Sequence, residues 1–222
     1  MDWDALFLSL QLGGLTVLVL IPLATALGRW LAVRSFRGKP IMEAALALPL
    51  VLPPTVLGFY LLVAFGSGSW LGQIYQRLFG ASLIFSFQGL LIASVIVNIP
   101  FAVQPIQRAF EAIAPDLRDA AATCGMSWWR MVRRIELPLA WPGILTGMVL
   151  TFAHTLGEFG VVLMVGGSIP GETKTIAISI YDRVQAFDDD AAGRMAALLL
   201  LISIVSIALS YALSQRIGRR HA

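Results

Sequence analysis

Apolar residues fill long runs of this chain that contain no Asp, Glu, Lys or Arg. Each run reaches the roughly 20 residues that a helix needs to cross the hydrocarbon core of a bilayer. Backbone groups in lipid must pair within their own segment, and alternating apolar strands are absent, so we interpret the runs as helices. The pattern predicts an all-α polytopic membrane protein with five transmembrane helices, at about 5–28, 44–65, 83–107, 139–164 and 195–215.

Local signals set two of these limits. The fourth span is carried past Glu158 because the apolar pattern resumes after that single acid. Between the second and third spans, residues 66–77 contain Gly and Ser that interrupt the apolar run, so we expect a loop there. The chain, 1–222, then forms one transmembrane domain.

Composition agrees with a membrane protein and adds an orientation. Apolar residues make up 58% of the chain and charged residues only 13%, which excludes an ordinary soluble domain. If the loops after spans one and three share a side with the C-terminal tail, that side holds most of the basic residues. They are Arg29, Arg34, Arg37, Lys39, Arg108, Arg118, Arg130, Arg133, Arg134, Arg216, Arg219 and Arg220. The positive-inside rule then places the N-terminus outside and the C-terminus in the cytoplasm.

The charge and the cysteine content exclude one class of partner and one kind of cross-link. The net charge of +3 does not form one basic face, so we expect no nucleic-acid partner. A single cysteine, Cys124, rules out an internal disulfide.

Prolines inside or at the ends of the predicted spans favour kinks or breaks, because each removes a backbone donor. They are Pro22, Pro49, Pro53, Pro54, Pro100 and Pro105. A broken helix in a membrane often marks a transport path, since its freed backbone groups need protein or water around them. A purely structural role is the competing interpretation for each proline.

Two ionisable residues, His154 and Glu158, lie within the predicted fourth span, where such groups are functional candidates. They are four residues apart, so His154 could donate to Glu158 or simply be a packed histidine. A Glu158 carboxylate facing an anionic cargo would repel it, which favours pairing of Glu158 with a helix N-terminus or a Thr, or a position near the outer mouth of the path. Our candidates for the translocation path or a gate are Pro53, Pro54, His154, Thr155, Gly157 and Glu158, and we expect no metal site.

The longest predicted cytoplasmic connection, residues 111–138, carries the signals of a short helix. Pro115 and Asp116 favour a helix start, and Asp119 suits its positive end. Gly125 favours a left-handed stop. Three alanines, 120–122, leave one side nearly bare, so this rod can enter a groove on a partner.

The second half of the connection is amphipathic. Trp128 and Trp129 stand close to Arg130, Arg133 and Arg134, a composition typical of a helix at the membrane surface. We expect Leu137-Pro138 to turn the chain into the fourth span.

The spacing of this loop resembles the EAA loop of ABC importer permeases. Asp119-Ala120-Ala121, three residues, Gly125, nine residues and Ile135-x-Leu137-Pro138 match that pattern, with Asp119 in place of the usual Glu. The resemblance implies a coupling helix that docks on a separate ATPase. The residues it assigns to coupling are Asp116, Asp119, Ala120, Ala121, Ala122, Gly125, Ile135, Leu137 and Pro138.

Four further segments resemble one branch of that family, the molybdate permease subunits. They begin at Ser35 (S-F-R-G-K-P), Leu48 (L-P-L-V-L-P-P-T-V-L-G-F-Y-L-L), Leu156 (L-G-E-F-G) and Ile169 (I-P-G-E-T-K-T-I). The resemblance implies a homodimer in the bacterial inner membrane. It also implies two cytoplasmic ABC ATPase subunits and a periplasmic or lipid-tethered oxyanion-binding protein as partners.

The resulting hypothesis is a permease that moves molybdate, and with it tungstate, into the cytoplasm. The chain lacks a Gly-x-x-x-x-Gly-Lys-Ser/Thr phosphate loop, so ATP is used by the partner ATPase and the chain is neither an enzyme nor the holder of a cofactor. The alternatives are a sulfate or tungstate ABC permease, or a secondary transporter driven by an ion gradient. The last predicts internal symmetry and charged relays, and has no use for the EAA pattern.

Overall fold

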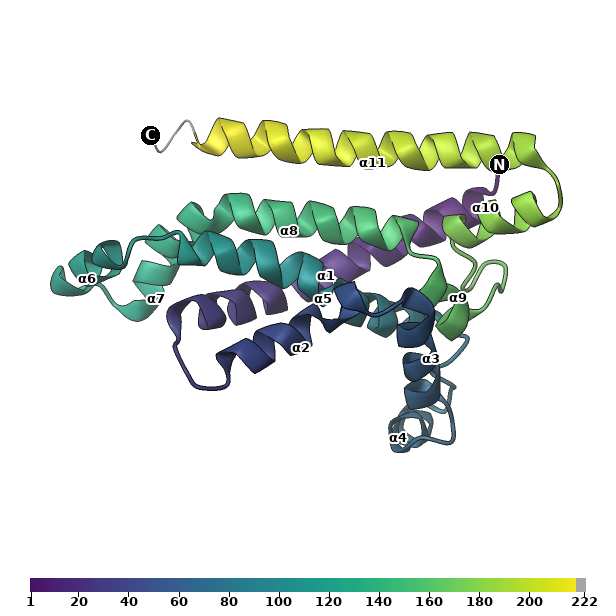
Figure 1. Ribbon diagram of the computed structural model, residues 1–222, viewed down its shortest axis with the longest axis horizontal. Helices are drawn as coiled ribbons and strands as arrows, with labels where there is room; N and C mark the ends of the chain where they lie inside the picture. The colour runs from purple at the N-terminus through teal and green to yellow at the C-terminus, as the bar shows by residue number, and fades with distance from the viewer. Residues whose placement is uncertain (219–222) are drawn as a thin grey trace.

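The computed structural model describes residues 1–218, and within them every regular element is helical (Figure 1). The helices are α1 (Trp3–Val33), α2 (Lys39–Val51), α3 (Pro54–Phe65), α4 (Trp70–Phe79), α5 (Phe87–Glu111), α6 (Pro115–Thr123), α7 (Trp128–Met131), the π-helix η1 (Val132–Glu136), α8 (Leu137–Gly157), α9 (Gly160–Gly166), α10 (Ile176–Gln185) and α11 (Asp189–Gly218). The all-α prediction is confirmed for this part of the chain.

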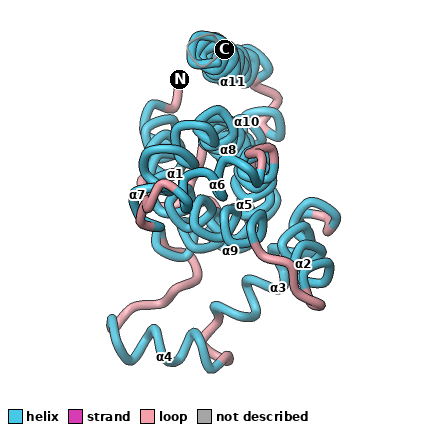
Figure 2. Tube along the Cα trace, turned by 90° about the vertical axis from the view of Figure 1, so that its left-hand side faces the viewer, coloured by secondary structure: helices cyan, strands magenta, loops and turns pink. Residues whose placement is uncertain are grey.

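The bundle is built on α1, α5 and α8, which pack along the long axis of the molecule, with α11 laid against α8 (Figure 1). Leu31, Ile106, Phe110 and Ala140 form the centre of its largest apolar cluster and are fully buried. Gly143 lets α8 approach α5 closely, because a Cβ at this position would meet Ala109 and the Pro105 carbonyl. Seen end-on, α2, α3 and α4 lie outside this group (Figure 2).

Four helical stretches of the described residues are long and apolar enough to cross a membrane. They are Trp3–Val33, Phe87–Glu111, Trp128–Gly157 and Asp189–Leu209, and the α2–α3 pair adds a fifth if its two arms form one span. These stretches overlap the five predicted spans, whose limits stay predictions.

The α2–α3 pair is bent by 108° at Leu52-Pro53. Pro53 and Pro54 follow one another, so two consecutive backbone donors are missing and the helix cannot continue. Of the kink or break expected at the prolines of α1 and α5, the break does not occur. Both α1 and α5 run unbroken past Pro22, Pro100 and Pro105, because each of these prolines removes only one hydrogen bond from a packed helix.

The loop expected at 66–77 is wrong, because α4 occupies most of it. The Ser69 hydroxyl accepts the Gly72 N–H at the first turn, at 2.9 Å. Gly80, with a φ of +69°, ends the helix in the left-handed conformation. These two caps define an amphipathic helix within a segment whose glycines and serines suggested a loop.

The expected turn at Leu137-Pro138 is also wrong, because helical backbone runs from Trp128 to Gly157 through η1. The Leu137 N–H reaches back five residues to the Val132 carbonyl, and Pro138 has no N–H to offer. The π-turn therefore lets the helix continue past Pro138. The segment before Pro138 is part of the same helical stretch as α8, and no turn separates the two.

At the other end of α8 the predicted fourth span is interrupted. The helix ends at Gly157, and α9 begins at Gly160, after two intervening residues. Beyond Gly166 the next helix is α10, with Ile176 buried at its start. Phe187 lies outside it and is almost fully exposed.

Candidate coupling loop and translocation path

The helix α6 stands at one end of the bundle, beside α7 (Figure 1). Pro115 occupies its first position, and Gly125 follows it with a φ of +70°. The Met126 N–H bonds to the Ala121 carbonyl and the Gly125 N–H to the Ala122 carbonyl, a Schellman stop. The short helix and its left-handed end are therefore as predicted.

The three alanines of α6 do not all lie on one exposed side, as the sequence suggested. Asp116, Asp119, Ala120 and Ala122 are exposed. Ala121 is buried. The exposed surface of α6 is thus acidic and carries small side chains, but it does not include Ala121.

A buried carboxylate that sequence analysis missed ties this loop to the bundle. Glu136 in η1 has no exposed surface. Its Oε2 accepts from Arg29 Nε of α1 at 2.6 Å, and its Oε1 accepts from Arg118 Nε of α6 at 2.7 Å. Two guanidinium groups, one from α1 and one from α6, thus balance the charge of one fully buried carboxylate.

Arg118 also closes the end of α5. Its terminal nitrogens donate to the carbonyls of Phe110 at 3.0 Å and Ile113 at 3.3 Å. The Arg29 guanidinium lies 5.0 Å from the ring centre of Trp128, at the start of α7. The cluster of Arg29, Arg118 and Glu136 therefore connects α1, α5, α6 and η1.

The remaining predicted coupling residues follow α6 in the sequence of the same loop. Ile135 is half-buried in η1, and Leu137 packs on the central apolar cluster. Pro138 is exposed at the second position of α8. None of these three residues lies on the acidic face of α6. The contact between this segment and α6 is made by Glu136, which accepts from Arg118.

The candidates from the fourth span meet a chain of buried polar groups. His154 Nδ1 lies 3.2 Å from Asn98 Oδ1, and Asn98 Nδ2 donates to the Thr155 hydroxyl at 3.1 Å. Ser94 lies 3.4 Å from the Thr155 hydroxyl and accepts from Thr16 at 3.0 Å. Thr16, Ser94 and Asn98 were missed, although an Asn inside an apolar run is itself a signal of such a network.

Glu158 sits at the break between α8 and α9. Its Oε1 accepts the Val161 N–H at 3.1 Å, so it caps the start of α9, which is one of the placements considered for it. His154 Nε2 lies 3.7 Å from its Oε2, which is beyond hydrogen-bond length. The His154 ring instead stacks on Phe101, with centroids 4.0 Å apart.

A cavity of about 140 Å³ brings part of the predicted path set together. Pro54 of α3, His154 and Glu158 line it, with Phe101 and the end of α2. Thr155 faces the buried polar chain instead. Pro53 and Gly157 are not among the residues that line this cavity.

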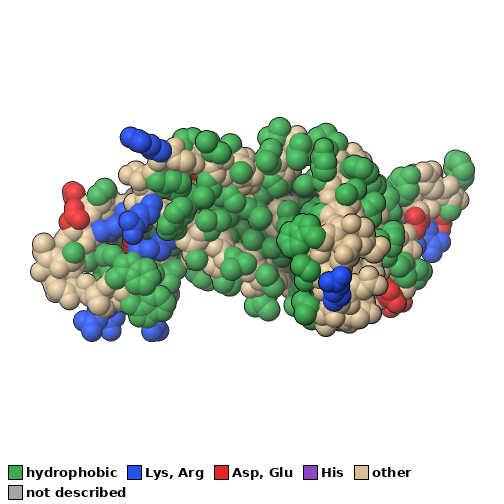
Figure 3. Space-filling model, turned by 90° about the horizontal axis from the view of Figure 1, so that it is seen from below, with side chains coloured by type: hydrophobic (Ala, Val, Ile, Leu, Met, Phe, Trp, Pro, Cys, Tyr) green, Lys and Arg blue, Asp and Glu red, His purple; other side chains and the backbone are tan. Residues whose placement is uncertain are grey.

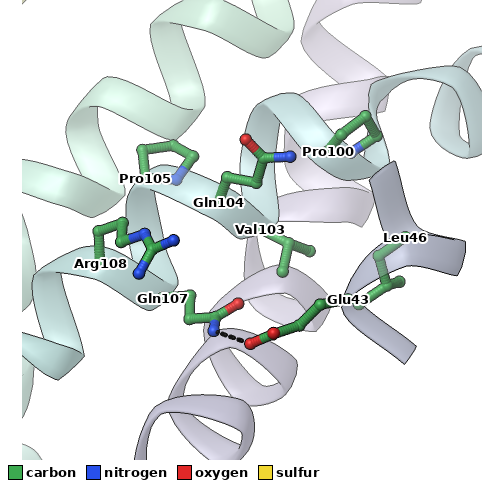
Figure 4. Close-up of a pocket in the computed structure, with 8 residues that line it drawn as sticks. All are labelled: Glu43, Leu46, Pro100, Val103, Gln104, Pro105, Gln107 and Arg108. Atoms are coloured by element: carbon green, nitrogen blue, oxygen red, sulfur yellow. Dashed lines mark hydrogen bonds between the residues drawn. The ribbon is translucent and has the colours of Figure 1, made fainter. Parts of the chain in front are cut away.

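A larger cavity of about 430 Å³ lies between α2 and α5 (Figure 4). Gln104, Gln107 and Arg108 of α5 point toward it, opposite Glu43 of α2. The Gln107 amide donates to Glu43 at 2.7 Å and to Glu111 at 2.9 Å. This polar end of α5 leads directly into the coupling loop.

At the opposite end, Asp2 joins α1 to α10. Its Oδ1 accepts the Ala5 N–H at 3.1 Å, and its Oδ2 accepts from the Ser179 hydroxyl at 2.7 Å. Burial raises the pKa of the Asp2 carboxyl, but these bonds, with Lys174 and Arg183, outweigh burial and hold the pKa below its ordinary value. Among the described residues, no three His, Cys, Asp or Glu side chains gather as a metal site would require.

Comparison with known proteins decides the family. Residues 24–221 match the family described as binding-protein-dependent transport system inner membrane component. The chain belongs to this family.

Relatives within the inner-membrane-component family cover nearly the whole chain. A molybdenum transport system permease protein of Azotobacter vinelandii is 46% identical over 92% of this chain and 90% of its own length. That of Escherichia coli K12 is 38% identical over 100% and 96%. A sulfate transport system permease protein of a Synechocystis species is 33% identical over 96% and 79%.

Solved structures of the same kind share the fold. A bacterial ABC transporter that imports alginate matches with a TM-score of 0.78 at 19% identity, over 96% of this chain and 79% of its own. A bacterial alginate ABC transporter in complex with an alginate-bound periplasmic protein matches with a TM-score of 0.76 at 19% identity, over 96% of this chain and 78% of its own. At this identity the likeness establishes the fold of the inner membrane component and nothing about its cargo.

Proposed function

We propose that this chain is the permease subunit of an ABC importer that moves molybdate into the cytoplasm. The observation that carries the proposal is the 46% identity, over nine-tenths of both chains, to a molybdenum transport permease. Tungstate is close to molybdate in size and charge and is expected to follow the same route. The family does no chemistry itself, so the free energy comes from a separate ATPase.

The geometry of α6 supports a coupling role for this helix. Asp116, Asp119 and Ala120 form an exposed face at the tip of the loop. Through Arg118 and Glu136, a displacement of α6 pulls directly on α1 and on the start of α8. This contact lets a soluble ATPase on the cytoplasmic side move the spans.

The α2–α3 break supports a pathway built from two copies of the chain. The α2 helix has no buried residue, and Pro53 and Pro54 deprive carbonyls at its end of their usual donors. Such backbone is tolerated at membrane depth only inside protein or beside water. A homodimer in the inner membrane, with the N-terminus outside, places a second copy or a watery path against the break.

Two partners complete the proposed importer. Two ATPase subunits dock on the two copies of α6, and an oxyanion-binding protein delivers the anion on the outer side. The alginate transporter in complex with its periplasmic protein supports a delivery partner of this kind. Pro54, His154, Thr155 and Glu158 then border the path or its gate, with Pro53 and Gly157 at the two helix breaks.

Sulfate is the second candidate cargo, favoured by the 33% identity to a sulfate permease over most of the chain. The lower identity makes it the weaker proposal.

Uptake into proteoliposomes tests the proposal. The chain is reconstituted with its ATPase and with ATP inside, and labelled molybdate or sulfate is offered with the binding protein at equal submicromolar levels. Uptake of molybdate at least tenfold faster than sulfate is expected, and it disappears when ATP is omitted. Faster uptake of sulfate overturns the choice of anion, whereas ATP-independent uptake overturns the transporter class.

A further inference from the structure

Three arginines that have no ion-pair partner among the described residues lie where the candidate coupling loop enters the bundle. Arg130 in α7 and Arg133 and Arg134 in η1 are all exposed. With Ser127 and Trp129 they line a cavity of about 470 Å³. Within residues 1–218, no carboxylate pairs with any of these three arginines.

The contrast with the nearby arginines is informative. Arg29 and Arg118, at the same end of the molecule, are both satisfied by Glu136. The cavity therefore gathers three positive charges that no described carboxylate balances, and an anion is the natural occupant. Figure 3 shows basic side chains gathered at the end that carries α6 and α7, next to hydrophobic ones.

The position of the cavity relative to the membrane follows from α8, the helix that comes after the residues lining the cavity. The 21 residues of α8 rise about 31 Å, close to the thickness of the hydrocarbon core. The α7–η1 segment precedes α8 in the same helical run, so it falls in the headgroup layer. Leu139 and Trp141, exposed in the next turns, face the acyl chains.

Tryptophans mark the same layer. Trp128 and Trp129 are both more than half exposed and stack on each other with centroids 5.7 Å apart. Indole rings prefer the interface between headgroups and acyl chains. Exposed indoles beside free guanidiniums match a phospholipid, which offers an anionic phosphate and an apolar edge together.

We infer that Arg130, Arg133 and Arg134, with Trp129, form a binding site for the headgroup of an anionic phospholipid of the cytoplasmic leaflet. The inference rests on the proposed orientation, which turns this end of the bundle toward that leaflet. The lipid neutralises the arginine cluster at the base of α8 and anchors the coupling loop to the membrane surface.

Lipid titration of the purified full-length chain tests the site. Native mass spectrometry in a neutral detergent measures the retention of phosphatidylglycerol against phosphatidylcholine. Wild type is expected to retain phosphatidylglycerol preferentially, and R133Q/R134Q is expected to weaken that binding roughly 10- to 30-fold. The matched control, R34Q/R37Q, removes two exposed arginines from the same side of the membrane but outside the cavity, and is expected to change binding less than twofold.

Other outcomes identify other occupants and overturn the inference. Equal retention of the two lipids, or equal loss in R133Q/R134Q and R34Q/R37Q, denies a specific site. Binding of inorganic phosphate or molybdate as tight as that of phosphatidylglycerol makes it a site for soluble anions. Displacement of the lipid by the docked ATPase assigns the cavity to that interface.

Two further measurements separate folding and transport from lipid binding. R133K/R134K keeps both charges, and is expected to fold and to keep most of the preference for phosphatidylglycerol. If R133Q/R134Q alone unfolds, loss of the lipid preference in R133K/R134K counts against a site that recognises charge. Because retention is measured without cargo, a failure of molybdate uptake leaves this result independent of the proposed function.

Discussion

Glu136 is fully buried between two arginines, so its surroundings accommodate a substitution poorly. Truncation to Ala leaves Arg29 and Arg118, each mostly buried, without their shared counter-charge. Breaking a buried ion pair from one side costs about 3 kcal/mol or more, because the remaining charge stays out of water. Glu136→Ala is therefore expected to lower the free energy of unfolding by about this amount, measured by chemical denaturation in detergent.

A second ion pair of equal length serves as the control. Lys174 and Asp182 also approach to 2.7 Å, but the Asp182 side chain is 40% exposed. An exposed pair contributes less than about 1 kcal/mol, so Asp182→Ala is expected to change stability little. Equal effects of the two substitutions would contradict the argument from burial.

Gly125 tests backbone conformation without a packing effect. Its φ is +70°, and a Cβ placed there would meet no atom within 4 Å. Gly125→Ala is expected to destabilise the chain by about 1 kcal/mol, because an L-residue is strained in this conformation. Gly193 in α11 is equally open but lies within a helix, so Gly193→Ala is expected to be neutral or stabilising in the same thermal melts.

At the scale of elements, Asp2 makes the contact between α1 and α10 dependent on pH. Because its folded pKa is lowered, its contribution to stability is complete above the unfolded pKa of about 3.9. The contribution is lost as the pH falls toward and through the lower folded value. Thermal melts from pH 6 to pH 3 are expected to show a steeper loss of stability in wild type than in Asp2→Asn, and parallel curves would contradict it.

The elements that could be predicted are those whose signals are local. Pro115 and Gly125 mark both ends of α6 within eleven positions, and two adjacent prolines mark the α2–α3 break. The α4 helix was missed because its glycines and serines resemble those of a loop, although Ser69 is a helix cap. Local signals cannot reveal contacts between distant segments.

The candidate site shows the same division. That Glu158 accepts the N–H of a helix start was one of the predicted placements, because the start of α9 at Gly160 is only two residues away. The bond between Arg29 and Glu136 spans 107 positions of the chain. Nothing near either residue indicates the other, so the cluster that joins α6 to the bundle becomes visible only when α1, α5 and α8 are packed together.

At the scale of the whole molecule, the α2–α3 break distinguishes a surface in contact with lipid from one beside a path. Thr55 in α3 and Leu18 in α1 are both exposed in the single chain. If a second copy and a watery path cover the break, a thiol at position 55 meets water, whereas a thiol at position 18 meets acyl chains. Thiolate forms only where water reaches it, so a membrane-impermeant maleimide distinguishes the two sites.

The labelling experiment needs a background without the exposed Cys124, which Cys124→Ser provides. In the assembled importer, Thr55→Cys is expected to react at least tenfold faster than Leu18→Cys, and its rate is expected to change when ATP binds the partner. In detergent, where the single chain is exposed all round, the two rates are expected to converge. Equal rates in the membrane would mean that α3 faces lipid, and the freed carbonyls of α2 would then need another protein partner to cover them.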